Sequence, residues 1–113
     1  MQRSGVPILT GTDLGNPDVF PGSSLHEELA LLVQSGYSPA QVLRAATAGA
    51  ARYLGRADFL GVIAIGKRAD LVLLDRDPLA DIGNTRTIAG VALRGHWFTR
   101  ATLDAILAAG TRR

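Results

Sequence analysis

The segment Val6-Pro7-Ile8-Leu9-Thr10-Gly11-Thr12-Asp13 is the part of the sequence that decides the fold. Its first half is a short, uninterrupted apolar run, which is typical of a strand covered on both faces, as in a parallel sheet. The run stops at Gly11, and the glycines and prolines of residues 14–22 predict a loop. Asp13 therefore stands where a buried strand meets a loop. In parallel sheets, ligands and catalytic groups gather at that end of the strands.

Two helices are predicted after this loop. The first has a stripe of apolar residues at helical spacing, formed by Leu25, Leu29, Leu32 and Val33. Ser24, with Glu27 three residues later, fits a capping box for this helix, and Gly36 follows it as a C-terminal glycine. Ser38 begins the second helix as its cap, with proline and glutamine at the first and third helical positions, and Gly55 ends it.

The second half of the chain changes from helical to strand patterns. Strands are predicted at Leu71–Leu74, which we expect to be buried, at Ile88–Leu93, and from Trp97 onward. Arg94-Gly95-His96 predicts a tight turn, and Thr99 or Thr102 can cap a last helix. The isolated chain is therefore predicted to be α+β, dividing into residues 1–56 and residues 57–113.

Length and composition exclude several classes of protein. The chain has 113 residues, whereas a complete eight-fold barrel needs at least about 200. It has no cysteine, which excludes disulfides and thiolate metal sites. The 12 basic and 10 acidic residues are scattered and give a net charge of only +2, so nucleic-acid binding is not favoured.

The sequence also bears on location and completeness. It has no apolar stretch near the ~20 residues of a membrane span, and its first residues lack the apolar core of a signal peptide. We therefore expect no membrane association and a soluble, cytoplasmic protein. Arg3-Ser4-Gly5 reads like the last turn of a helix with its C-terminal glycine, but no helix body precedes it. This pattern leads us to expect missing sequence upstream.

Two residues are candidates for a functional site, and each has an alternative interpretation. Asp13 could contact a metal or take a proton from a metal-bound water, or it could simply cap the loop. His26 lies one turn into the first helix, where it is either on the same rim as Asp13 or a packed or surface residue. With His96, which we interpret as a turn residue, the chain has two histidines and cannot build a multi-histidine metal site.

The other carboxylates have a structural interpretation. Asp70 precedes a predicted strand, and we expect it to satisfy backbone donors in the turn at residues 66–69. Asp75, Asp77 and Asp81 flank a loop that contains Pro78, and we expect them to provide caps and solvation rather than catalysis.

Taken in order and spacing, a set of motifs resembles the C-terminal portion of a metal-dependent amidohydrolase, in the imidazolonepropionase-like and prolidase-like branch. The motifs are Gly11-Thr12-Asp13, His26-Glu27-Glu28-Leu29, Ser38-Pro39-Ala40 leading to Ala45-Ala46-Thr47, Leu54-Gly55, Gly61 with Gly66-Lys67-Arg68-Ala69-Asp70-Leu71-Val72, and Asp77-Pro78-Leu79 with Asp81-Ile82. Each motif alone is weak, but the ordered set covers nearly the whole chain and is specific.

The resemblance implies a fold and a site. Residues 6–13 would be the last strand of a (β/α)8 barrel, followed by its helices, and residues after about 60 would be the C-terminal part of a composite β-sandwich. Asp13 would contact the metal centre and accept the proton of the attacking water, and His26 would contact substrate. The metal, expected to be zinc, needs ligands from upstream strands, because a catalytic zinc site takes three protein ligands. We therefore expect this chain alone to hold no metal and to be inactive.

Two hypotheses follow. In the first, the chain is part of an amidohydrolase that cleaves an amide or related C–N bond, in a cyclic amide or a dipeptide, by metal-activated water. In the second, it is a stand-alone, non-catalytic interaction module that needs a partner, such as a complementing barrel chain or an oligomer.

Overall fold

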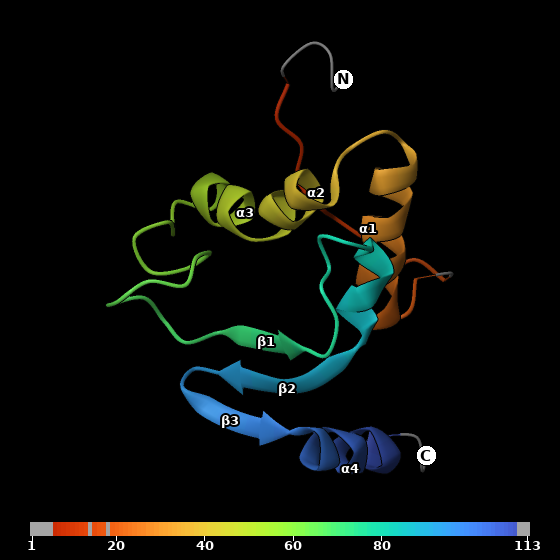
Figure 1. Ribbon diagram of the computed structural model, residues 1–113, viewed down its shortest axis with the longest axis vertical. Coiled ribbons are helices and arrows are strands. Elements are labelled where there is room, and N and C mark those ends of the chain that lie inside the picture. Colours follow the sequence, from red (N-terminus) through yellow and green to blue (C-terminus); the bar gives the residue numbers. More distant parts are fainter. Residues whose placement is uncertain (1–5, 14, 18, 111–113) are drawn as a thin grey trace.

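The computed structural model describes residues 6–13, 15–17 and 19–110 of the chain (Figure 1). The predicted helix tail at residues 3–5 lies outside them. In chain order, the elements of this part are α1 (Ser23–Gln34), α2 (Pro39–Ala46), α3 (Ala48–Tyr53), β1 (Leu71–Leu74), the 3-10 helix η2 (Ile82–Arg86), β2 (Ile88–Leu93), β3 (His96–Thr99) and α4 (Arg100–Gly110). Three α-helices precede the strands and one follows them, and the strands form a sheet of their own, so the predicted α+β class is confirmed.

The strands form an antiparallel sheet in the order β1-β2-β3. Val91 of β2 is paired with Val72 of β1 on one side and with Phe98 of β3 on the other. A two-residue turn joins β2 to β3, with φ angles of 51° at Arg94 and 81° at Gly95. Positive φ at both positions is the requirement of a type I′ hairpin turn. The predicted turn is thus confirmed, except that His96 already belongs to β3.

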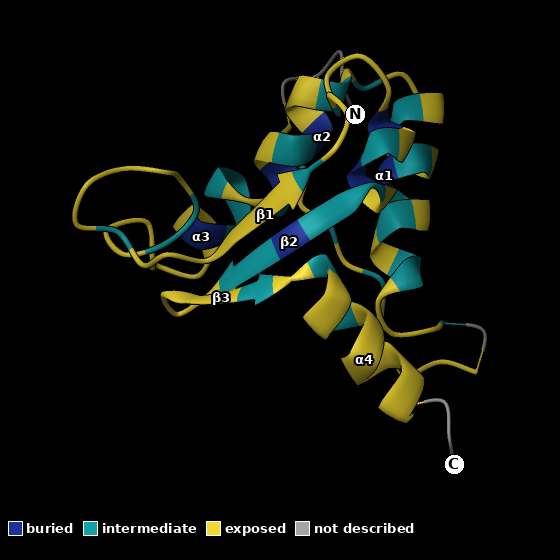
Figure 2. Ribbon diagram, turned by 60° about the horizontal axis from the view of Figure 1, so that its bottom comes forward, coloured by how far each residue is buried: buried dark blue, intermediate teal, exposed yellow. Residues whose placement is uncertain are grey.

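Strand β1 was predicted to be buried, and this prediction is wrong. Val72 is 57% exposed and Leu73 54% exposed. Figure 2 shows most of β1 in the colour of exposed residues, and the last residue of the strand is of intermediate burial. Burial requires a covering layer, and β1 has only one neighbouring strand in the described part of the chain. An apolar strand with a free edge is a template for further pairing.

Residues 6–13, which the sequence predicts as a strand, form no strand in the structure. A parallel strand exists only through hydrogen bonds to neighbouring strands. The sheet that the described residues form consists of β1, β2 and β3, and residues 6–13 pair with none of them. The apolar run of residues 6–9 therefore has no neighbouring strand among the described residues with which to form a sheet.

The helix starts differ in how well the sequence predicts them. At α2 the capping box is confirmed: Ser38 Oγ accepts from the Gln41 N–H at 3.2 Å, and Gln41 Oε1 accepts from the Ser38 N–H at 2.8 Å. At α1 the predicted cap is wrong, because the helix begins at Ser23 and its N-cap is Gly22, with no side-chain cap bond. Ser24 is thus already inside the helix, two residues after the N-cap position.

The hydrophobic core lies between α1, α2 and η2. Val42 of α2 is fully buried and packs with Leu29 of α1 and Ile82 of η2. The blue patches of α1 and α2 in Figure 2 mark this contact. Ile82 comes from the second half of the chain, so both halves contribute to one small core. The division at residue 56 remains a prediction.

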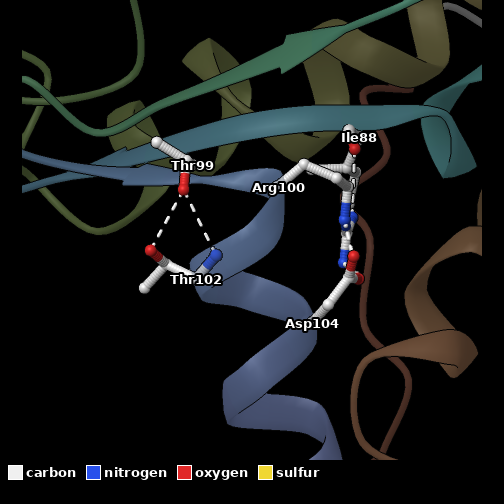
Figure 3. Close-up of polar contacts among 5 residues, drawn as sticks. All are labelled: Ile88, Thr99, Arg100, Thr102 and Asp104. Atoms are coloured by element: carbon white, nitrogen blue, oxygen red, sulfur yellow. Dashed lines mark hydrogen bonds and ion pairs between the residues drawn. The ribbon is translucent and has the colours of Figure 1, made fainter.

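Helix α4 is fixed to the sheet through its first turn (Figure 3). Thr99 Oγ1 accepts from the Thr102 N–H at 3.2 Å, so Thr99 is the cap of the two predicted candidates. Arg100 donates to the Ile88 carbonyl of β2 at 3.0 Å and pairs with Asp104 at 2.7 Å. Within the described ranges, no helix combines the length and the apolar character needed to cross a membrane.

Candidate functional site

Asp13 lies exposed in the turn that follows the apolar segment. The side-chain amide of Asn16 donates to the Asp13 carboxylate Oδ2 and, at 3.1 Å, to the Asp13 carbonyl oxygen. The Asn16 backbone N–H also donates to that carbonyl, at 3.4 Å. Asp13 therefore does organise the loop, as one of its two interpretations predicts. Its exposed carboxylate is still free to act on a ligand.

The backbone of Asp13 has an unusual conformation, with φ at 55°. Residues other than glycine rarely adopt positive φ, and in folded proteins such residues cluster in turns and at functional sites. Among the described residues the other non-glycine case is Arg94, which the type I′ hairpin turn explains. Asp13 thus combines a sterically restricted backbone with a carboxylate that faces solvent.

Glu28 is a residue of this site that the sequence analysis did not single out. The Gly11 N–H, two residues before Asp13, donates to Glu28 Oε1 at 2.7 Å. The bond joins the Asp13 turn to the first half of α1. The sequence shows two adjacent glutamates, Glu27 and Glu28, and only the orientation of α1 decides that Glu28 faces the turn while Glu27 is exposed.

His26 contacts a different element. Its Nδ1 lies 2.9 Å from Oγ1 of Thr85 in η2, and the Thr85 hydroxyl donates to the Ile82 carbonyl at 3.0 Å. Burial, and secondly the positive charge of Arg86, lower the pKa of His26 below its ordinary value. The lowered pKa favours the neutral form of the His26 ring, which lies against η2. Asp13 and His26 have separate partners, Asn16 and Thr85.

Asp70, Asp77 and Asp81 have structural roles of the kind that were expected, and the role expected of Asp75 stays a prediction. Asp70 Oδ1 accepts from the Arg94 N–H at 2.8 Å, and this bond, followed by the bond from Arg68, lowers the pKa of Asp70. Its acceptor role is as predicted, but the donor lies in the β2–β3 turn rather than at residues 66–69. Asp77 and Asp81 each accept from a backbone N–H two residues later, at 2.8 Å. These contacts are loop and helix caps.

A metal centre needs several ligands close together. The described part of the chain contains no group of three His, Cys, Asp or Glu side chains that could hold a metal ion. Asp13 has an amide, Asn16, beside it rather than a second metal-binding side chain. These residues therefore do not fit a metal by themselves, and a metal at Asp13 would need ligands from elsewhere.

A cavity of about 470 Å³ lies away from both candidate residues. Its lining includes three cationic residues, Arg56, Lys67 and Arg68. Lys67 already donates to the Ala57 carbonyl, and Arg68 pairs with Asp70. Since two of the cations are engaged in holding the loop, we assign no ligand to this cavity.

Comparison with curated proteins gives partial matches to several enzymes. The chain is 44% identical over 83 residues to the imidazolonepropionase of Aromatoleum aromaticum, covering 73% of this chain and 20% of that protein. It is 48% identical over 63 residues to adenine deaminase 2 of Agrobacterium fabrum, covering 51% of this chain and 10% of that protein. The chain therefore spans between a tenth and a fifth of the length of these two relatives.

Solved structures match most of the chain. A putative prolidase from Bifidobacterium longum superposes with a TM-score of 0.79 at 37% identity, over 96% of this chain and 28% of that one. A Xaa-Pro dipeptidase with bound methionine superposes with a TM-score of 0.78 at 30% identity, over 87% of this chain and 23% of that one. These matches confirm the expected fold, a part of the amidohydrolase architecture. The model of the amidohydrolase family matches residues 1–98, and the chain therefore belongs to the amidohydrolase family.

Proposed function

We propose that the chain supplies a catalytic carboxylate, Asp13, to an amidohydrolase that cleaves an amide or related C–N bond. The observation that carries this proposal is the exposed Asp13 carboxylate on a backbone of positive φ, held by Asn16. Aspartate is among the non-glycine residues that adopt positive φ in turns, and side chains held in this way include those of functional sites. The match of the family model to residues 1–98 includes this turn.

The chemistry assigned to Asp13 is that of a general base. As water attacks the amide carbonyl carbon, the Asp13 carboxylate accepts a proton from that water, and it can later return the proton to the leaving nitrogen. Members of this family are generally metal-dependent. In our proposal the metal is zinc and contacts Asp13, with its other ligands outside the described residues.

The substrate class is proposed from the relatives. One is named imidazolonepropionase, and the structural neighbours include a prolidase and a Xaa-Pro dipeptidase. Their names support a small cyclic amide or a dipeptide as substrate. His26 would contact it through Nε2, since Nδ1 is engaged with Thr85. The neutral ring then offers an acceptor for an N–H of the substrate. The cytoplasmic location expected from the sequence remains part of this proposal.

The exposed sheet supports a proposal for the rest of the molecule. Leu73 and Trp97, which the strand register places on the same face of the sheet, are each more than half exposed. In our proposal, residues 57–113 contribute to a composite β-sandwich whose further strands cover these side chains. Burying them removes apolar area from water, which stabilises the assembly.

The same exposed strand favours a second candidate, a non-catalytic module that pairs with a separate partner chain through the free edge of β1. The two candidates differ in how the purified chain behaves. A monomer that unfolds cooperatively at micromolar concentration favours the module. Aggregation of the chain when expressed alone favours a part of a larger enzyme.

A chimera tests the catalytic assignment. In the chimera, the part of this chain that matches the Aromatoleum aromaticum imidazolonepropionase, extended where needed so that Asp13 is included, replaces the corresponding segment of that enzyme, and imidazolonepropionase activity is measured. Loss of a general base lowers kcat by roughly 10²- to 10⁴-fold, so we expect a loss of that size for Asp13→Asn. Asp58→Asn, at an exposed carboxylate outside the site, is the matched control and should stay within about twofold. An Asp13→Asn chimera that keeps full kcat would show that Asp13 is not the base.

A further inference from the structure

We infer that Glu28 is the positioning residue of the Asp13 turn. This inference rests on the proposed function, because it assigns Glu28 a role in presenting the Asp13 carboxylate. It is carried by the bond between Gly11 and Glu28, by the burial of the second Glu28 oxygen, and by the backbone of Asp13.

The bond from Gly11 is well placed for this role. Its N–H donates to Glu28 Oε1 at 2.7 Å, a length typical of charge-assisted hydrogen bonds. Gly11 and Asp13 are separated by one residue, and no strand fixes residues 6–13. Asn16, the other partner of the turn, belongs to the same loop and cannot set its position relative to α1. Glu28 on α1 is the contact that ties the turn to a regular element.

The second carboxylate oxygen of Glu28 indicates that this contact has a cost. Glu28 Oε2 is buried and accepts no hydrogen bond within the described ranges of the chain. A buried acceptor without a donor destabilises a protein by roughly 1–3 kcal/mol, and more where the group is charged. An apolar residue at this position of α1 would avoid that cost. The presence of a glutamate at this position is explained if its Oε1 is needed to accept the hydrogen bond from the Gly11 N–H.

The geometry leads to a mechanical account. Glu28 Oε1 holds the Gly11 amide, the peptide plane of Gly11 sets the path of Thr12, and Asp13 follows with φ at 55°. Displacing a catalytic group by about 1 Å can cost roughly 100-fold in rate. Glu28 would therefore act on kcat through Asp13, without contacting the substrate itself.

The first test uses nuclear magnetic resonance on the full 113-residue chain. In Glu28→Ala, the Gly11 amide should exchange with solvent roughly 10- to 100-fold faster, the loss expected for one hydrogen bond to a charged acceptor. The Asn16 side-chain amide resonances should shift, because the turn moves. Glu28→Gln keeps an oxygen at the same place and should restore both signals. Glu27→Ala, at the exposed neighbouring glutamate, is the matched control and should change neither signal.

The second test separates this inference from the catalytic assignment. In the chimera described above, Glu28→Ala should lower kcat by about 10- to 100-fold with KM within about twofold, and Glu28→Gln should recover most of it. An unchanged Gly11 amide in Glu28→Ala overturns the inference, whatever the activity. A changed amide with unchanged kcat also overturns it, because the contact would then be structural only. If Asp13→Asn leaves kcat intact, the proposed function fails, and the amide result alone still decides whether Glu28 holds the turn.

Discussion

The loop between α3 and β1 offers a sharp test of the packing, at Gly61. Gly61 has φ at 99°, and a Cβ built on it would lie 2.7 Å from the Ala51 Cβ and 3.1 Å from the Ala48 Cα of α3. Gly61→Ala therefore combines two effects. Positive φ costs an alanine roughly 1–2 kcal/mol. Forcing a methyl group against the backbone of a helix costs roughly a further 1–3 kcal/mol. The total expected loss in the free energy of unfolding is about 2–5 kcal/mol.

Gly66 in the same loop is the matched control. Its φ is 86°, and a Cβ there would have no atom within 4 Å. Gly66→Ala should therefore cost only the backbone part, roughly 1–2 kcal/mol. Urea unfolding of both variants, followed by circular dichroism and by fluorescence of Trp97, measures the difference. Equal losses for the two substitutions would refute the close packing of Gly61 on α3, and so would a smaller loss at Gly61.

Three further predictions concern the core, a helix cap and pH. Val42→Ala removes two methyl groups from a fully buried site and should lower the free energy of unfolding by roughly 2–3 kcal/mol. Urea denaturation measures this loss, and a value under about 0.5 kcal/mol would contradict the burial of Val42. Ser38→Ala removes the capping box of α2 and should lower the free energy of unfolding by about 1 kcal/mol, whereas Ser38→Asp should keep most of the stability that the cap provides. Thermal melts of the two variants measure the difference. The pKa of His26 is lower in the folded protein than the value of 6.5 in the unfolded chain, so the unfolded chain binds the proton more readily. The contribution of His26 to the free energy of unfolding should thus be fully present above about pH 6.5 and decline as the pH falls through the lower pKa of the folded state. Urea midpoints measured at several pH values should show a weaker decline in His26→Gln than in the unsubstituted chain.

Features with a local signal could be predicted from the sequence. The capping box at Ser38 needs only two residues three positions apart, Ser38 and Gln41, and it is present. The strand Ile88–Leu93 has the predicted limits, since its apolar run is followed directly by the Arg94-Gly95 turn. By contrast, the cap of α1 was misplaced, because the helix begins at Ser23, two residues earlier than a cap at Ser24 requires, and its N-cap is Gly22, which has no side chain to mark it.

Features that depend on distant residues could not be predicted. The burial expected for Leu71–Leu74 depends on a layer that would have to cover it, and an apolar pattern does not report whether that layer exists. The contact between His26 and Thr85 joins positions 59 residues apart. The same holds for the site: Asp13 was found from its place after an apolar run, whereas Glu28 could be told from Glu27 only by the orientation of α1.

The order of strands in the sheet has a consequence for the kinetics of folding. The strands β1, β2 and β3 lie in the sheet in the same order as in the chain, and all their pairings fall within residues 71–99. Contacts between residues close in sequence form quickly, because little loop-closure entropy is lost. The hairpin of β2 and β3, joined by two residues, should therefore appear early in a refolding experiment. The docking of η2 on α1 through Thr85 and His26 should come late, as the step that joins the two halves of the chain.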